Sequence, residues 1–229
     1  MKTSIASRTL LLAMACWHIT CATATCYDYV LINSRGTGEP QGESIGFRGM
    51  IEQVMSALPN GVRFDTKYLA FPDATQLTTV KGAKDLAEVI RGGVRDCPEQ
   101  KYALMGYSQG ATVSNLVLQA LDPTSKEGQS IKAVVQVGNP YHSPYKEGNK
   151  DDKCGISTAG ANGILNGIAH YAIPDSWYET GKIRDICYTN DQVCNGVSLG
   201  DLFSPTHLGY GFNPSVQSCG AHFLLDKLS

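Results

Sequence analysis

The sequence has no uninterrupted apolar run long enough to cross a membrane. The clearest apolar stretch, residues 10–15, falls well short of the roughly 20 residues that a membrane-spanning helix needs. No basic run occurs, and no basic face with interleaved aromatic residues, so nucleic acid is not expected as a partner. The slight excess of acidic residues, 21 against 19 basic, disfavours polyanions in general.

Residues 1–24 are typical of a secretory signal peptide. Lys2 and Arg8 supply positive charge, the apolar stretch 10–15 follows, and residues 22–24 (Ala-Thr-Ala) form a small-residue cleavage site. We therefore expect a secreted, extracellular protein whose mature chain, 25–229, begins at Thr25. Its length suits one catalytic domain, and we expect a monomer without a membrane span.

Six cysteines remain after the predicted cleavage, and none forms a C-x-x-C pair. Their tightest spacing is Cys187 to Cys194, and the histidines lie far apart in sequence, so a zinc site is not expected. An even number of cysteines in an exported chain predicts three disulfides. The sequence alone leaves all 15 pairings of six cysteines open.

Apolar periodicity predicts strands that alternate with helices. The strands are expected at residues 29–32, 62–71, 102–105, 131–137 and 183–188, and the helices at 47–58, 80–93 or slightly beyond, 111–121 and 221–228. This order predicts an α/β fold with a mostly parallel central sheet covered by helices on both faces. Residues 141–182 are rich in Gly, Asn and charge, and are expected as an ordered, non-lid insertion over one edge of the site.

The sequence Gly106-Tyr107-Ser108-Gln109-Gly110 is the strongest chemical motif. It is a G-x-S-x-G match between a predicted strand and a predicted helix, which is the context of a nucleophile elbow. Glycines flank the serine because the reversal is too tight for side chains. An ordinary Gly-Ser turn is the alternative, but it does not need a strand before it and a helix after it. We therefore take Ser108 as the nucleophile of an α/β-hydrolase.

A serine hydroxyl needs a histidine base, which in turn needs a carboxylate, and in this fold they follow the serine as acid and then histidine. His207 follows the last predicted strand and suits the base; the other histidines after residue 25 are His142, His170 and His222. The acid is expected to leave the end of the last strand, which favours Asp191. Asp185, Asp201 or a simple turn at Asp191 are the alternatives.

An oxyanion hole is also required, because acyl transfer develops negative charge on the carbonyl oxygen. The fold supplies one donor from the residue after the nucleophile, here the Gln109 N–H, and another from a loop after an early strand. The loop 35–40 (Arg-Gly-Thr-Gly-Glu-Pro) fits that place, with Thr37 as the candidate. A plain glycine-rich turn is the competing interpretation.

Four motifs in order resemble the cutinase family, in particular its fungal cutinase-like, polyester-hydrolysing branch. They are residues 34–42 (Ser-Arg-Gly-Thr-Gly-Glu-Pro-Gln-Gly), 106–110, 191–194 (Asp-Gln-Val-Cys) and 207–211 (His-Leu-Gly-Tyr-Gly). The resemblance runs from about Cys26 to the C-terminus. It implies a small α/β-hydrolase with an open, solvent-exposed serine and an oxyanion hole made by Thr37 and Gln109.

The resemblance also implies disulfides Cys26–Cys97 and Cys187–Cys194. Cys154 in the 141–182 insertion and Cys219 depart from the family pattern and suggest a third bridge between them.

The function expected from this resemblance is hydrolysis of carboxylic esters through an acyl-enzyme, with no cofactor and no metal. Cutin, aliphatic polyesters and short to medium-chain esters are the expected substrates, whether polymeric or small molecules. An acetylxylan esterase of the same broad family is the alternative, favoured by a polar cleft with sugar-stacking aromatics. A binding module with the hydrolase fold and little activity is disfavoured, since it has no need for serine, acid, base and both oxyanion donors.

Overall fold

The computed structural model describes residues 25–72, 76–168, 170–196 and 204–229. The predicted signal peptide and Asp201 lie outside the described residues.

Six strands form one sheet in the order β2-β1-β3-β4-β6-β5, and every neighbouring pair is parallel. Their bounds are β1 (Tyr29–Ser34), β2 (Gly61–Asp65), β3 (Lys101–Tyr107), β4 (Ile131–Val137), β5 (Asn149–Lys150) and β6 (Ile183–Ile186). This arrangement confirms the predicted parallel sheet. Because all the strands run the same way, their carboxyl ends meet along one edge of the fold.

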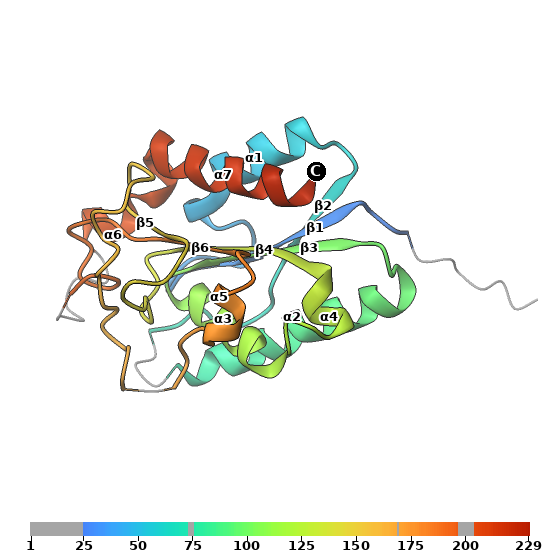
Figure 1. Cartoon of the computed structure of the whole chain (residues 1–229), viewed down its shortest axis with the longest axis horizontal. Coiled ribbons are helices and arrows are strands. Elements are labelled where there is room, and N and C mark those ends of the chain that lie inside the picture. Colours follow the sequence, from blue (N-terminus) through green and yellow to red (C-terminus); the bar gives the residue numbers. More distant parts are fainter. Residues whose placement is uncertain (1–24, 73–75, 169, 197–203) are drawn as a thin grey trace, which may run out of the picture.

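Helices cover both faces of the sheet (Figure 1). One face carries α1 (Arg48–Ala57) and α7 (Pro214–Leu228); the other carries α2 (Leu77–Asp96), α3 (Gln109–Ala120), α4 (Lys126–Ser130) and α5 (Asp175–Tyr178). Three short helical segments, η1 (Ile45–Phe47), α6 (Pro205–Leu208) and η3 (Tyr210–Phe212), complete the described helices. This three-layer arrangement confirms the predicted fold class.

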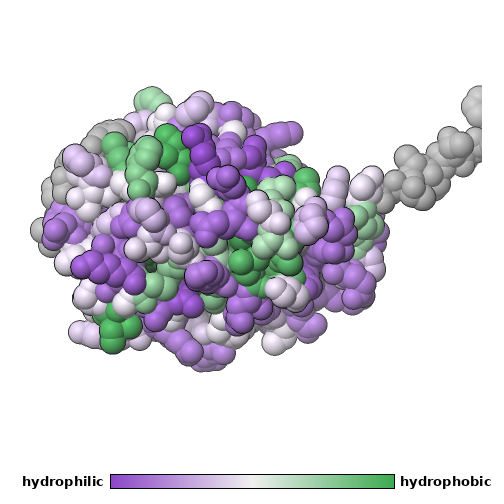
Figure 2. All heavy atoms as spheres, turned by 90° about the horizontal axis from the view of Figure 1, so that it is seen from above, coloured by the Kyte–Doolittle hydropathy of each residue, from purple (hydrophilic) through white to green (hydrophobic). Residues whose placement is uncertain are grey.

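The pleat of each strand divides the core into two clusters. Leu31 lies in the cluster under α1 and α7 with Met50 and Leu224, whereas its neighbour Ile32 lies in the cluster under α2 and α3 with Leu86. A strand buried on both faces must be apolar throughout, which explains the continuous apolar runs of the sequence. The outer face above α1 and α7 is mainly hydrophilic, with small separate hydrophobic areas (Figure 2).

The strand predicted at 62–71 is wrong in length, since β2 ends at Asp65. Beyond it the chain leaves the sheet and binds Arg35, whose guanidinium donates to the carbonyls of Thr66 and Tyr68. Gly38 N–H also donates to the Ala70 carbonyl at 2.8 Å. The backbone of this segment therefore pairs with the loop after β1 instead of extending the sheet.

Two predicted helices extend beyond their apolar stripes. Helix α2 runs through Gly93 to Asp96, and glycine is required at position 93 because a Cβ there would lie 1.6 Å from the Tyr102 hydroxyl oxygen. Helix α7 begins at Pro214, seven residues before the prediction. Asn213 caps it by accepting the backbone N–H of Ser215 at 2.9 Å, and proline suits a first helical position.

The insertion at 141–182 is part of the core rather than only a cover for the site. It supplies edge strand β5 and helix α5, and the Trp177 side chain is completely buried. The indole N–H of Trp177 donates to the Leu118 carbonyl at 2.7 Å, which ties the insertion to the end of α3.

Three disulfides join Cys26 to Cys97, Cys154 to Cys219 and Cys187 to Cys194, the pairs that the family resemblance and its departures suggested. None of the helices in the described part of the chain combines the length and apolar character needed to cross a bilayer.

Candidate active site

Ser108 lies at the tight reversal between β3 and α3. Its backbone has φ 51° and ψ −115°, a conformation that non-glycine residues rarely adopt and that often marks functional sites. A Cβ on Gly106 would lie 2.6 Å from the Ala111 Cα, and one on Gly110 would lie 2.0 Å from the Ser34 carbonyl oxygen. Both flanking glycines are therefore required by contact with backbone, as a nucleophile elbow demands.

A continuous chain of hydrogen bonds joins Ser108, His207 and Asp191. The Ser108 hydroxyl oxygen lies 2.8 Å from His207 Nε2, and His207 Nδ1 lies 2.9 Å from Asp191 Oδ2. All three side chains are buried. This geometry lets the imidazole remove the serine proton while the carboxylate holds the ring in the required tautomer.

Ser108 is less open than the resemblance implies, since only 3% of the residue is exposed. The tight turn of the elbow and the neighbouring His207 ring cover most of the surface of Ser108. The expectation that Ser108 is open and solvent-exposed is therefore wrong.

The acid lies in the loop that follows β6. The Cys187–Cys194 disulfide closes this loop, and Asp191 Oδ1 accepts the backbone N–H of Val193 at 2.9 Å. The Asp191 N–H donates to the Tyr188 carbonyl at 3.1 Å. These bonds fix the carboxylate at the carboxyl end of the sheet, on the side where His207 lies.

The base lies in a short helix rather than in the predicted loop. Ser204 caps α6 by accepting the backbone N–H of His207 at 3.1 Å. The Tyr107 hydroxyl, from the end of β3, donates to the His207 carbonyl at 2.8 Å. The backbone of His207 is thus held from two directions.

The two candidate oxyanion segments lie against each other. The carbonyl of Ser34, at the end of β1 just before the loop that carries Thr37, packs on Gly110, next to Gln109. Gln109 is the first residue of α3, where a backbone N–H has no acceptor within its own helix. Its side-chain amide is engaged elsewhere and donates to the Phe71 carbonyl at 3.0 Å. The backbone N–H is therefore the group of Gln109 that suits an oxyanion.

The structure separates the remaining histidines and acids from the triad. His170 and His222 are exposed, the latter on α7. His142 and Asp185 are both fully buried and form a separate pair, with His142 Nδ1 3.0 Å from Asp185 Oδ2. Neither forms a hydrogen bond with Ser108, His207 or Asp191, so the triad assignment keeps Asp191 as the acid.

Tyr210 is a site residue that the sequence reasoning missed. Its hydroxyl donates to Asp191 Oδ2 at 2.6 Å. From the sequence, Tyr210 was only one residue of the motif at 207–211. Tyr210 follows Asp191 by 19 positions and lies in a different element, so no local sequence pattern marks the contact.

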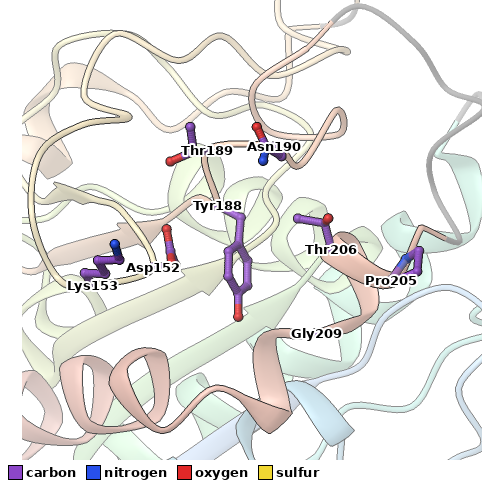
Figure 3. Close-up of a pocket in the computed structure, with 8 residues that line it drawn as sticks. All are labelled: Asp152, Lys153, Tyr188, Thr189, Asn190, Pro205, Thr206 and Gly209. Atoms are coloured by element: carbon purple, nitrogen blue, oxygen red, sulfur yellow. The ribbon is translucent and has the colours of Figure 1, made fainter.

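A polar pocket of about 500 Å³ lies behind the loops of the acid and the base (Figure 3). Its walls include Tyr188 and the residues next to the triad members, Asn190 and Thr206, but no triad residue lines it. The Tyr188 ring stands in the middle of this view and packs edge-on against Tyr210 with ring centroids 4.7 Å apart.

Exposed apolar side chains belong to two segments that contact or adjoin the triad residues. Leu69, Phe71 and Leu77 are at least 60% exposed and belong to the segment that the Gln109 side chain holds beside the elbow. Leu208, which follows His207, is 45% exposed, and Phe212 is 77% exposed. We call these five residues the apolar rim.

Comparison with known proteins gives a consistent result. The sequence model of the Cutinase family matches residues 25–228. A cutinase-like protein from Cryptococcus sp. has a solved structure that is 34% identical, with a TM-score of 0.78, covering 90% of this chain and 97% of that one.

More distant relatives extend the comparison. Cutinase cut1 of Trichoderma harzianum is 26% identical over 190 residues, or 81% of this chain, but the match spans only 62% of that relative's length. The catalytic core of an acetyl xylan esterase from Trichoderma reesei is 21% identical, with a TM-score of 0.69, over 89% of this chain and all of that one. At that identity the likeness supports the shared fold alone.

Proposed function

Because the chain belongs to the cutinase family, we propose that it is a serine esterase whose nucleophile, base and acid are Ser108, His207 and Asp191. The observation that carries this proposal is the unbroken hydrogen-bond chain from Asp191 through His207 to the Ser108 hydroxyl.

The proposed reaction begins when His207 Nε2 takes the Ser108 proton and Oγ attacks the ester carbonyl carbon. Negative charge then develops on the carbonyl oxygen, where the backbone N–H of Gln109 and the Thr37 backbone N–H or hydroxyl act as donors. Return of the proton from His207 to the leaving alcohol yields the acyl-enzyme. Water, deprotonated by the same imidazole, then releases the acid. No cofactor or metal takes part in this sequence.

The apolar rim supports a substrate with aliphatic character, such as cutin, other aliphatic polyesters or short to medium-chain esters. Exposed Phe71 and Leu77, next to the elbow, and Phe212, in η3 with Tyr210, offer such a chain apolar surface near the site. The alternative substrate, acetylated xylan, needs polar groups and an aromatic platform. The pocket with Tyr188 has those features but has no triad residue among its lining residues.

Rates on p-nitrophenyl esters from acetate to palmitate, on a polyester film and on acetylated xylan test this proposal. We expect activity on the film, and the highest ester rates at short to medium chain lengths without a sharp rise above the solubility limit. Substitution Phe71→Ser is expected to lower the film rate more than the p-nitrophenyl acetate rate. Faster release of acetate from xylan than of products from the film would favour the alternative.

Ser108→Ala tests the nucleophile, and Ser114→Ala is its matched control. Ser114 is also a completely buried serine, but it lies within α3, where its hydroxyl contacts only a backbone carbonyl at 3.5 Å. We expect Ser108→Ala to lose nearly all turnover and Ser114→Ala to keep it. Equal activities would exclude Ser108 as the nucleophile.

We also propose that the protein is secreted as a monomer after cleavage between Ala24 and Thr25. The three disulfides support an oxidising destination. N-terminal sequencing of protein collected from culture medium should begin at Thr25, and sedimentation should give the mass of one mature chain. An intact N-terminus on secreted protein would contradict the proposed cleavage.

A further inference from the structure

Tyr210 is completely buried at the start of η3, with its hydroxyl inside the site and its ring among those of the site. The hydroxyl lies 2.6 Å from Asp191 Oδ2. The ring meets the His207 ring edge-on, with centroids 6.2 Å apart and an interplanar angle of 88°. Tyr210 therefore contacts the acid through its hydroxyl and the base through its ring.

Asp191 has three kinds of donor around its carboxylate. Val193 N–H donates to Oδ1, while the His207 ring and the Tyr210 hydroxyl both approach Oδ2, at 2.9 and 2.6 Å. The Tyr210 hydroxyl gives the shortest of these contacts. A bond to a charged acceptor is also stronger than a neutral one, so this hydroxyl restrains the carboxylate firmly.

The direction of the Tyr210 hydroxyl bond is fixed by its surroundings. The backbone N–H of Tyr188 donates to the Tyr210 oxygen at 3.1 Å, which leaves the hydroxyl proton for Asp191. Burial, followed by the charge of Asp191, raises the pKa of Tyr210 well above its usual value of 10. The hydroxyl consequently remains a donor throughout the working pH range of an esterase.

We propose that Tyr210 is a positioning residue that holds the Asp191 carboxylate in place and shares its negative charge. This inference rests on the proposed triad and adds a fourth member that acts through the acid. By drawing electron density from Oδ2, the hydroxyl weakens the pull of the carboxylate on the His207 proton. Without the hydroxyl, the full charge of the carboxylate would act on the His207 ring.

Among the described residues, the titratable partner of this hydroxyl is Asp191, to which it donates. His207, Tyr107 and Tyr188 pack against the Tyr210 ring. The charge of Asp191 also raises the pKa of His142, without a hydrogen bond between the two.

Tyr210→Phe tests the proposal because it removes only the hydroxyl. We expect kcat to fall about tenfold or more, as for loss of a hydrogen bond to a charged group, with little change in KM. The acidic limb of the kcat/KM profile should move to higher pH by about half a unit or more, since the carboxylate charge would then act on the His207 ring alone. A merely structural tyrosine would leave that limb in place.

Tyr107→Phe is the matched control. It removes a buried hydroxyl that donates to the His207 backbone carbonyl instead of to the carboxylate. We expect it to leave the acidic limb unshifted even if turnover falls. Equal shifts in the two variants would overturn the proposal.

Site-specific replacement of Tyr210 by 3-fluorotyrosine gives a second test should the phenylalanine variant fold poorly. The fluorinated phenol keeps the hydroxyl but is a stronger acid and donor, so the limb should move to lower pH. An unchanged limb would overturn the role of Tyr210. The Ser108→Ala variant separates the two proposals: if it stays active the triad itself fails, and if it is inactive only the role of Tyr210 is in question.

Discussion

His142 Nδ1 lies 3.0 Å from Asp185 Oδ2, and both side chains are completely buried. The molecule therefore contains a second His–Asp pair besides the one in the triad. Asn139 also donates to Asp185 Oδ2 at 2.8 Å, so the pair ties the segment after β4 to strand β6. Within the described residues this pair forms no hydrogen bond with Ser108, and its role is structural.

The His142–Asp185 pair should make stability depend on pH. Burial lowers the pKa of His142, but the charge and hydrogen bond of Asp185 outweigh it, and the net pKa is raised above 6.5. A raised folded-state pKa gives stability that is complete below about pH 6.5 and is lost as pH rises through the folded value. We expect His142→Gln to lose about 3 kcal/mol at pH 5 and less at pH 9.

Urea unfolding of both proteins between pH 5 and 9 measures this difference. His222→Gln, on the exposed face of α7, is the control and should change stability little. A difference between wild type and His142→Gln that does not shrink with rising pH would mean that the histidine is buried uncharged.

Asp191→Asn tests the acid of the proposed triad. The amide keeps the shape of the side chain but favours the wrong imidazole tautomer, so kcat should fall on the order of 10⁴, as in serine proteases. Folding should be nearly unchanged, since the loop bonds of the Asp191 backbone remain.

Asp185→Asn is the matched control, because it alters the carboxylate of the other His–Asp pair. We expect a stability loss of about 3 kcal/mol and a fall in activity per folded molecule of less than about tenfold. Steady-state rates beside thermal unfolding curves separate the two effects. A reversed pattern, with Asp185→Asn inactive and Asp191→Asn active, would refute the proposed acid.

The Cys187–Cys194 disulfide should matter more for turnover than for folding. Its loop separation of 7 residues predicts about 2.5 kcal/mol from loop closure, against about 4.4 kcal/mol for Cys26–Cys97 with a separation of 71. Cys194 Sγ lies 3.3 Å from Asp191 Oδ2, so loss of the bridge frees the acid directly.

Paired serine substitutions at each bridge provide the comparison. We expect Cys187→Ser with Cys194→Ser to reduce kcat clearly while shifting Tm modestly. Cys26→Ser with Cys97→Ser should lower Tm further but spare kcat in the folded protein. Equal kcat losses would show that the short bridge has no special effect on the acid.

Gly110→Ala should disrupt the nucleophile elbow. A Cβ at this position would meet the Ser34 carbonyl at 2.0 Å, and backbone cannot move aside as a flexible side chain can. We expect stability to fall by about 2 kcal/mol or more, and most of the activity to be lost.

Gly92→Ala is the control, since its nearest contact is the end of the Arg95 side chain at 3.9 Å. That change should stabilise α2 by up to about 1 kcal/mol. Denaturant unfolding and ester hydrolysis measure both.

The fold was predictable where residues satisfy purely local demands. The apolar run at 131–137 could be placed from sequence because a strand buried on both faces needs such a run. The end of β2 could not, because it depends on Arg35, which lies 30 residues before Asp65 and captures the chain beyond it. The contribution of residues 141–182 to the core was missed for the same reason, because Trp177 is buried by contact with the distant helix α3.

The candidate site divides in the same way. The elbow carries its own geometric signature in Gly106 and Gly110, and the order of acid and base follows from the fold. The second His–Asp pair and the contact of Tyr210 with Asp191 join residues that are 43 and 19 positions apart. Nothing in the local sequence pattern specifies either pairing, and both emerge only when the strands are assembled.

The edge strands of the sheet have a consequence for the protein at high concentration. At one edge, β5 consists of only Asn149 and Lys150; at the other, β2 carries Arg63 and Asp65, whose side chains form an ion pair at 3.0 Å. A short or charged edge is a poor template for an incoming strand from another molecule. The sheet therefore resists growth into an aggregate from either edge, even where many copies of the molecule meet.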